Sequence, residues 1–315
     1  MAEKQFIATL KPDQTITDVF WVRSKELRNN RNGKPYLYLQ VCDRTGQMSA
    51  FMWNNFNEVA AAFQRDDFVE IKGTIQQFQN QLQLNIHKLS KTDASAVQMS
   101  DYLPVSVRDP EEMFRAVCGH IERTGNPALK GLLESIFLDE QIASAFKRAP
   151  AAKNLHHAFL GGLIEHTLSL VELCRHVAAQ YGGVNVDLLV SGALLHDLGK
   201  IVELDFKGPF VYTNEGNLLG HIAIGLNMVA DRIGRVPGFP EETRLQLLHL
   251  LASHHGKVEH GSPRPPATLE AVLLHHLDML DSRAAAFQQA SAHCTGEWTA
   301  YSALFERALY VKKLE

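Results

Sequence analysis

The first 92 residues carry short runs in which apolar and polar side chains alternate, whereas the rest of the chain repeats apolar residues every three or four positions. Alternation is typical of half-buried strands, and a spacing near 3.6 residues is typical of amphipathic helices. The cleanest alternating run is 68–73. The pattern therefore predicts a β-rich segment followed by a helical one.

Five strands and one helix are expected in the β-rich segment. The expected strands are 15–22, 36–41, 48–53, 68–73 and 78–86, and the expected helix is 55–64. A helix between the third and fourth of five strands is the layout of an OB-fold, a small barrel whose loop between strands 1 and 2 is a principal contact for nucleic acid. We therefore expect an OB-fold nucleic-acid-binding domain at 1–92.

Helical spacing fills the chain from residue 111 almost to its end, with glycine or proline between many of the segments. The expected helices are 111–123, 127–136, 139–149, 160–181, 186–197, 220–233, 241–254, 267–289 and 298–312. A stretch rich in Ser, Thr, Asp and Ala at 90–100 precedes them. We therefore expect a linker at 93–110 and an all-α domain at 111–315.

Charge changes the picture of the barrel. The whole chain has a net charge of −4, yet residues 1–95 carry 12 Lys and Arg against 10 Asp and Glu. Residues 22–35, which join the first two expected strands, contain five of these cations and one acid. Such a basic segment in an acidic chain is a candidate phosphate-contacting loop. Its expected nucleic-acid contacts are Arg28, Arg31 and Lys34.

Aromatic side chains interleave with this loop, as single-strand binding requires, because bases stack on rings while phosphates pair with cations. In the second expected strand, Tyr36 and Tyr38 share one face and the opposite face is apolar. Both tyrosines are therefore candidate contacts for single-stranded RNA or DNA. The alternative is that many aromatics of this region fill the barrel core, and the pattern leaves open which face Phe51 and Trp53 share.

Membrane and disulfide signals are absent from the sequence. No apolar run approaches the roughly 20 residues that a membrane span needs, and the N-terminus lacks the apolar core of a signal peptide. The four cysteines stand far apart with no Cys-x-x-Cys pair, which argues against a zinc knuckle or a disulfide framework. We therefore expect a cytoplasmic protein with no membrane partner.

Histidines are concentrated in one part of the helical region, since twelve of the fifteen lie between residues 156 and 276. Neutral imidazole is the commonest metal ligand in proteins. Within that stretch an apolar helix runs into His196-Asp197 and stops at Gly199. One backbone segment thus offers an imidazole and a carboxylate that can bridge two metals, and the sequence predicts a metal centre at this helix end.

The ligand-type residues occur in an order that resembles the HD-domain superfamily of metal-dependent phosphohydrolases. That order is His166, His196-Asp197, His221, His254-His255 and Asp278. The motifs NLHHAFLGGLIEHT at 154–167, HDLGK at 196–200 and SHHG at 253–256 are more narrowly similar to the YhaM-type 3′→5′ exoribonucleases. Those proteins also carry an N-terminal OB-fold, so the resemblance covers nearly the whole chain.

This resemblance implies two divalent metal ions. The first would be held by His166, His196, Asp197 and Asp278. The second would be bridged by Asp197 and held by His221 with His254, His255 or both. Asp281 lies three residues after Asp278 on the same helical face and is the alternative carboxylate.

Ligand chemistry and the resemblance together bear on the identity of the metal, and the remaining catalytic candidates lie close to the metal motifs in the sequence. Mixed imidazole and carboxylate ligands suit Mn²⁺, Fe²⁺, Zn²⁺ or Ni²⁺ better than Ca²⁺, and the resemblance favours Mn²⁺, with Mg²⁺ as an alternative. Asp197 is a catalytic candidate because it would serve both metals. Lys200 is a candidate to contact a phosphate oxygen as a point charge, and Arg283 is a weaker one. His156 and His157 are catalytic candidates in the same cleft, with a structural role as the alternative.

Three functions are compatible with these features. The leading prediction is a 3′→5′ exonuclease that hydrolyses single-stranded RNA or DNA to nucleoside monophosphates; the direction and the exonucleolytic mode come from the resemblance. The second is an HD-type nucleotide or cyclic-dinucleotide phosphohydrolase. The third is a non-catalytic single-strand-binding protein with an inert HD domain, against which the intact set of ligand positions argues.

Overall fold

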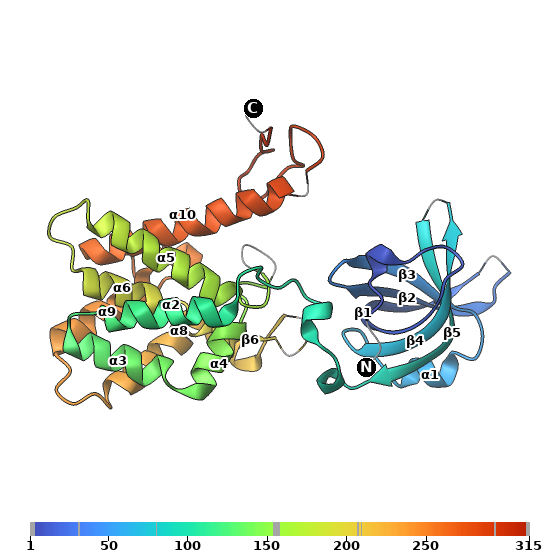
Figure 1. The fold of residues 1–315 in the computed structure, drawn as a ribbon, viewed down its shortest axis with the longest axis horizontal. Coiled ribbons are helices and arrows are strands. Elements are labelled where there is room, and N and C mark those ends of the chain that lie inside the picture. Colours follow the sequence, from blue (N-terminus) through green and yellow to red (C-terminus); the bar gives the residue numbers. More distant parts are fainter. Residues whose placement is uncertain are drawn as a thin grey trace. The chain divides into compact units, whose positions relative to one another are not determined.

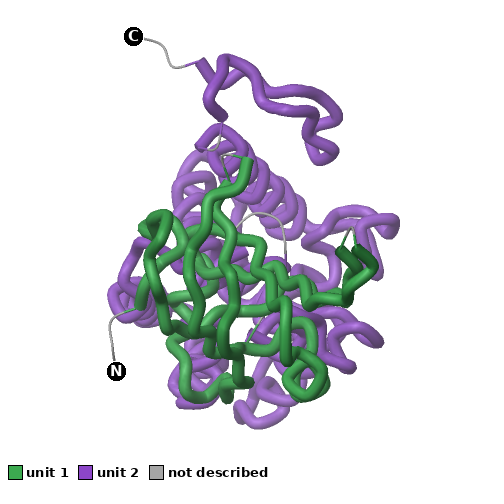
Figure 2. The backbone as a smooth tube through the Cα atoms, turned by 90° about the vertical axis from the view of Figure 1, so that its right-hand side faces the viewer, with its two compact units in different colours: residues 1–104, 207–209 green, residues 105–206, 210–315 purple. Residues whose placement is uncertain are grey.

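The computed structural model describes residues 4–30, 32–79, 81–153, 158–206, 208, 210–292 and 294–312. The chain folds into two compact units, one of residues 1–104 with 207–209 and one of residues 105–206 with 210–315 (Figure 2). The first is built mainly from strands and the second from helices, which confirms the change of periodicity along the sequence.

The first unit contains a closed barrel with the strand order β1-β2-β3-β5-β4 (Figure 1). The strands are β1 (Thr15–Asn29), β2 (Pro35–Asp43), β3 (Gly46–Met52), β4 (Phe68–Phe78) and β5 (Gln81–Thr92). β3 pairs in parallel with β5, and the other neighbours pair antiparallel. Helix α1 (Asn57–Ala61) connects β3 to β4 along the chain. The OB-fold expected for the N-terminal region is thereby confirmed.

Alternation along β2 decides which side chains fill the barrel. Leu37 and Leu39 are fully buried, and Phe20 of β1 joins them in the interior. Tyr36 and Tyr38 point to the other side of the strand and are half-buried. The barrel therefore takes its core from the apolar face of β2 and leaves the tyrosine face on the outside.

The basic segment lies mostly in strands, which corrects the expectation of a loop. β1 and β2 leave only residues 30–34 as their connection, so Arg28 is a strand residue paired with Tyr36 in the antiparallel register. The ladder continues past the predicted strand end because cross-strand contacts support it, and the Arg28 guanidinium lies 3.7 Å from the centroid of the Tyr38 ring. The Lys25 ammonium donates to two backbone carbonyl groups at and after the end of α1.

Part of the segment expected as a linker packs on the barrel. Tyr102 is buried; its ring meets Phe68 edge-on with centroids 4.8 Å apart, and its hydroxyl donates to the Val19 carbonyl at 3.0 Å. Residues up to Pro104 belong to the first compact unit. The boundaries 1–92, 93–110 and 111–315 stay a prediction.

The second unit is predominantly helical. Its helices are α2 (Pro110–Glu122), α3 (Pro127–Phe137), α4 (Glu140–Arg148), α5 (Gly162–Ala178), α6 (Val186–Leu195), α7 (Lys200–Glu203), α8 (Asn214–Ile233), α9 (Glu241–Ser253) and α10 (Leu269–Ala292). Two of them begin where the sequence signals a start, at Asp109-Pro110 and Asn126-Pro127, with the Asp or Asn side chain accepting backbone N–H groups of the first turn. No helix in the described ranges is both long and apolar enough to span a membrane.

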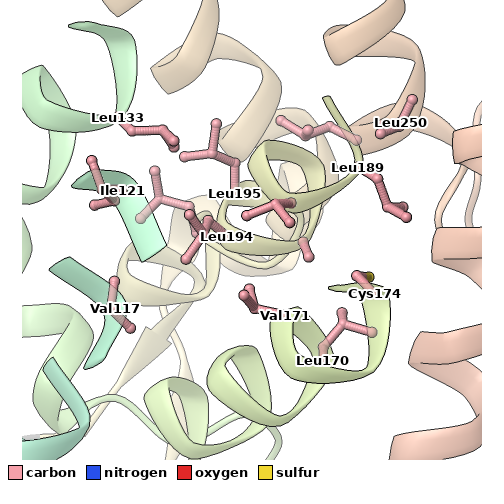
Figure 3. Close-up of a cluster of buried hydrophobic side chains, with 14 of the residues drawn as sticks. Val117, Ile121, Leu133, Leu170, Val171, Cys174, Leu189, Leu194, Leu195 and Leu250 are labelled. Atoms are coloured by element: carbon pink, nitrogen blue, oxygen red, sulfur yellow. The ribbon is translucent and has the colours of Figure 1, made fainter. Parts of the chain in front are cut away.

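Helix α6 is the centre of the helical unit. From Leu188 to Leu195 every residue is buried, because neighbouring helices cover it on all sides. Figure 3 shows Leu189, Leu194 and Leu195 of α6 among apolar side chains of α2, α3, α5 and α9. Burial of this extent fixes the helix firmly. The segment that follows α6 therefore starts from one of the best-held points of the unit.

Two details of the helical unit differ from the expectation. The domain is not strictly all-α, because β6 (Leu204–Asp205) and β7 (Val211–Tyr212) form a two-stranded hairpin. Residues 298–312, expected as a helix, instead form a loop closed by the bridges Trp298–Tyr310 and Ser302–Arg307. The Trp298 and Tyr310 rings lie 5.0 Å apart across the loop.

Candidate metal centre and nucleic-acid surface

The ligand candidates come from five helices that meet around the end of α6. His166 lies on α5, His221 on α8, and Asp278 on α10. The pairs His196-Asp197 and His254-His255 directly follow α6 and α9. Residues that are up to 112 positions apart in sequence are therefore brought together by helix packing, as the motif order predicts.

One group of ligand atoms surrounds the Nε2 atoms of His166 and His196, which lie 3.2 Å apart. Asp278 Oδ1 is 3.2 Å from His166 Nε2, and Asp197 Oδ2 is 3.3 Å from His196 Nε2. The histidines and Asp197 are almost fully buried. Two imidazole nitrogens and two carboxylate oxygens at this spacing match a metal site of the kind expected.

A second group lies on the other oxygen of the same carboxylate. Asp197 Oδ1 is 3.5 Å from His221 Nε2 and 3.8 Å from His254 Nε2. Within the described residues these three buried atoms have no hydrogen-bond partner. Buried polar atoms without partners are costly, and here they point at one another together with His255, which can join them in holding a metal ion. The residues therefore fit a second metal ion, with Asp197 between the two groups.

Every candidate imidazole is oriented through its other nitrogen. The Nδ1 atoms of His196, His254 and His255 face backbone carbonyl oxygens at 2.8, 2.8 and 2.9 Å. His166 Nδ1 faces the Asp281 carboxylate at 2.7 Å, and His221 Nδ1 faces the Glu203 carboxylate at 3.1 Å. A partner on Nδ1 fixes the ring and leaves Nε2 for a metal. All five rings thus present Nε2 toward the centre.

The two competing aspartates of α10 occupy different places. Asp278 lies with the ligand atoms, on the Nε2 side of His166. Asp281 lies on the Nδ1 side of the same ring and also accepts a hydrogen bond from the Ser169 hydroxyl. This geometry favours Asp278 as the ligand and gives Asp281 the task of holding His166, and the assignment remains a proposal.

Burial and charge act against each other on His166. Burial lowers its pKa, but the carboxylates of Asp278 and Asp281 outweigh that effect and raise the pKa to about 10. Burial lowers the pKa of His254 and of His255. His254 and His255 are thus suited to the neutral form that binds a metal, whereas the raised pKa of His166 favours a bound proton until a metal competes for it.

Two glycines allow α7 and α8 to approach each other closely enough for His221 to lie near Asp197. Gly220 has a φ of 72°, which bends α8 immediately before His221, and the His221 N–H donates to the Glu203 carboxylate at 2.9 Å. Gly199 lies against the same place, because a Cβ built on it would be 2.1 Å from the His221 carbonyl oxygen. Only glycine allows this approach without a shift of one helix.

Lys200 places a cation directly at the metal centre. Its Nζ lies 2.6 Å from Asp197 Oδ2. Burial raises the pKa of the Asp197 carboxyl, but Lys200 and His196 outweigh it and hold that pKa well below its usual value. Lys200 also lines the cavity over the centre, as Arg283 does, so both remain candidate phosphate contacts.

Some site residues fall outside the sequence predictions or outside the described part of the chain. Sequence reasoning missed Glu203, and it considered Asp281 only as a ligand, because neither orienting role has a motif; the nearest signal is their helical spacing from Lys200 and Asp278. The catalytic candidates His156 and His157 and the nucleic-acid candidate Arg31 lie outside the described residues.

The outer face of the barrel carries a cluster of rings. The Tyr36 and Trp53 rings lie tilted to each other with centroids 4.7 Å apart, and Tyr38 meets Phe51 edge-on at 5.5 Å. Phe51 and Trp53 therefore share the tyrosine face, which the sequence left open, and Trp53 is 45% exposed. Arg28 covers the Tyr38 ring. Exposed rings beside a cation are suited to stacking bases of a single strand.

Each of the two units matches a known protein family. Residues 20–92 match the family described as OB-fold nucleic acid binding domain, and residues 163–283 match the HD domain family. Three relatives share the name 3′-5′ exoribonuclease YhaM. The protein of Geobacillus sp. (strain WCH70) is 35% identical, with 80% of this chain and 77% of the relative covered.

The other two relatives cover still more of the chain. The protein of Halalkalibacterium halodurans is 33% identical over 86% of this chain and 84% of its own length. The protein of Listeria monocytogenes serotype 4b is 34% identical over 85% of each. The matches run through both the barrel and the HD domain, as the motifs predicted. The chain belongs to the family of YhaM proteins.

Proposed function

We propose that this protein is a divalent-metal-dependent exonuclease that shortens single-stranded RNA from its 3′ end and releases nucleoside monophosphates. The proposal is supported by the names of its relatives. The observation that carries it is the position of Asp197, whose two oxygens face two separate groups of imidazoles. Such an arrangement suits a pair of metals that share one carboxylate.

The ligands proposed for these metals are those of the two groups around Asp197. The first set is His166, His196, Asp197 and Asp278, and the second is Asp197, His221, His254 and His255. Two divalent ions, Mn²⁺ in this proposal, would supply an activated water and a counter-charge for the leaving oxygen. Asp197 would hold both ions at a fixed separation, and Lys200 would meet a non-bridging phosphate oxygen once Asp197 is shared with metal.

The barrel would hold the strand whose end is cut. Tyr36, Tyr38, Phe51 and Trp53 offer stacking surfaces, and Arg28 offers a cation on the same face. Lys34 and Arg31 lie in the same basic stretch of the sequence, 22–35. Stacking is tolerant of base identity, which suits an enzyme that degrades strands of many sequences. All four cysteines, each within the described ranges, are free thiols, consistent with the proposed cytoplasmic location.

The test follows the length of RNA products over time. A single-stranded RNA labelled at its 5′ end is incubated with the protein and Mn²⁺, Mg²⁺ or a chelator, and a circular RNA of the same sequence serves as control. We expect stepwise shortening of the linear RNA, no attack on the circle, and no reaction with chelator. DNA of the same sequence measures the preference for the sugar.

Other outcomes would replace the proposal. Cleavage of the circle would make the protein an endonuclease. If the protein hydrolyses mononucleotides or cyclic dinucleotides but leaves RNA uncut, it is a nucleotide phosphohydrolase. Strand binding without bound metal and without hydrolysis would leave only a binding protein.

A further inference from the structure

We infer that Tyr212 and Lys153 form the subsite for the 3′-terminal nucleotide of the substrate, with the base stacked on the Tyr212 ring and Lys153 beside a phosphate. This inference rests on the exonuclease activity proposed above, and it names where the terminal base is held in the helical unit. The motifs of the sequence do not mark either residue.

A cavity of about 750 Å³ lies over the metal centre, entirely within the helical unit. Asp197, His221 and Asp278 line it, and so do Lys153 and Tyr212. Its volume falls within the range of pockets for small ligands, roughly 300–1,000 Å³. A strand end can enter such a space, whereas a long stretch of strand cannot. A nucleotide with its phosphate at the metal centre therefore has Tyr212 and Lys153 as neighbours.

Tyr212 lines this cavity, and its aromatic ring is partly exposed. It is 44% exposed, and the Lys153 ammonium lies 5.5 Å from its ring centroid. An exposed aromatic ring with a cation beside it is the combination that binds single-stranded nucleic acid, because the ring stacks a base and the cation meets a phosphate. Stacking does not depend on the edges of the base, so this subsite would accept any of the four nucleotides.

The hairpin that contains Tyr212 is hydrogen-bonded to the segment that orients the ligand His221. Tyr212 pairs with Leu204, which is buried and directly follows Glu203, the residue that orients His221. Next to Tyr212, the Thr213 N–H donates to the Glu203 carbonyl at 2.9 Å, and the Thr213 hydroxyl donates to the carbonyl of Val202 at 2.9 Å. The backbone that carries the Tyr212 ring is therefore held next to Glu203, which orients His221, as a nucleotide subsite needs.

The test compares two RNAs that differ only in their last nucleotide, which in one of them lacks its base. In wild-type protein with Mn²⁺, the first cleavage of the abasic RNA should be slower in kcat/KM by on the order of tenfold, toward the lower end of what one stacked base contributes. Tyr212→Ala should lose a similar factor on normal RNA and show little further loss on the abasic one. Tyr212→Phe, which keeps the ring, should behave as wild type.

Two further variants complete the experiment. Tyr181→Ala removes another exposed tyrosine of the same unit that does not line the cavity, and it should match wild type on both RNAs. Lys153→Ala should raise KM and reduce the log–log salt slope of binding by about 0.7. Metal content and circular dichroism of each variant check that the centre and the fold are intact.

The outcomes separate this inference from the proposed function. If wild-type protein shortens RNA but Tyr212→Ala loses the same factor on both RNAs, or loses nothing, the terminal base does not stack on Tyr212 and the inference is wrong. If wild-type protein does not shorten RNA at all, the proposed function fails first.

Discussion

Replacement of Gly199 by alanine should remove one half of the metal centre and leave the other. The added Cβ would lie 2.1 Å from the His221 carbonyl oxygen and 2.7 Å from the Gly225 nitrogen. Ordinary contact begins at 3.4 Å, so α7 and α8 must separate by about 1.3 Å. Ligand distances in metal sites tolerate only about 0.2 Å. His221 would therefore leave the second group, whereas His166 lies on another helix and would stay.

The expected losses can be measured separately. Bound Mn²⁺, counted by mass spectrometry of the purified protein, should fall from two ions per chain to one. The value of kcat on single-stranded RNA should fall about a hundredfold or more, the scale of a 1 Å misplacement in an active site. Overpacking of this kind typically costs about 1–3 kcal/mol of stability, which circular dichroism and thermal unfolding would register.

Two other glycines provide a graded control. A Cβ on Gly225 would meet the Gly199 nitrogen at 3.4 Å, and a Cβ on Gly182 would meet nothing within 4 Å. Activity should therefore decrease in the order Gly182→Ala, Gly225→Ala, Gly199→Ala, with the first equal to wild type. A folded Gly199→Ala protein that keeps two metals and full activity would refute the argument.

Three further predictions address the carboxylate, the barrel and the fold. Asp197→Asn should abolish hydrolysis with the fold intact, and retention of more than about a tenth of the activity with metal bound would contradict a bridging role. Replacing Arg28 and Lys34 together by alanine should reduce the log–log salt slope of single-strand binding by about 1.4, and an unchanged slope would move the binding surface elsewhere. Burial and the nearby Arg175 lower the pKa of His120 from 6.5 to about 4 in the folded protein, so stability should fall as the pH drops from about 6.5 toward 4. In the His120→Gln variant, the free energy of unfolding measured in urea at pH 7.5, 5.5 and 4.5 should fall less than in wild type. Equal falls in the two proteins would disprove the role of His120.

The strand and helix periods predicted most of the fold because burial follows them closely. Along β2, the inward set from Leu37 and the outward set from Tyr36 separate as alternation requires. The prediction failed at 298–312, where a segment with helical spacing of apolar residues forms a loop closed by two isolated bridges instead. It also stopped β1 too early, because cross-strand contacts rather than apolar alternation hold its end.

The sequence predicted which residues form the candidate centre, but it did not predict how their side chains are arranged around it. Motif order named the imidazoles and Asp197, since these carry the chemistry. The choice between Asp278 and Asp281 depends on which side of the His166 ring each occupies, and three residues of helix do not determine that. Glu203 was missed because a carboxylate at the end of a four-residue helix has no pattern that distinguishes it.

The way in which the imidazoles are oriented has a consequence for how substitutions affect this protein. His196 and His254 each use the carbonyl oxygen of the residue three positions earlier, at the last turn of α6 and of α9. A backbone carbonyl survives any side-chain replacement, so variation at Ala193 or Leu251 can alter packing without changing the tautomer of the ring that follows. His166 and His221 depend instead on one carboxyl side chain each, and a single nucleotide change can delete either carboxylate. Natural and laboratory variants should therefore tolerate apolar exchange at the two helix ends far better than any loss of acid at positions 281 and 203.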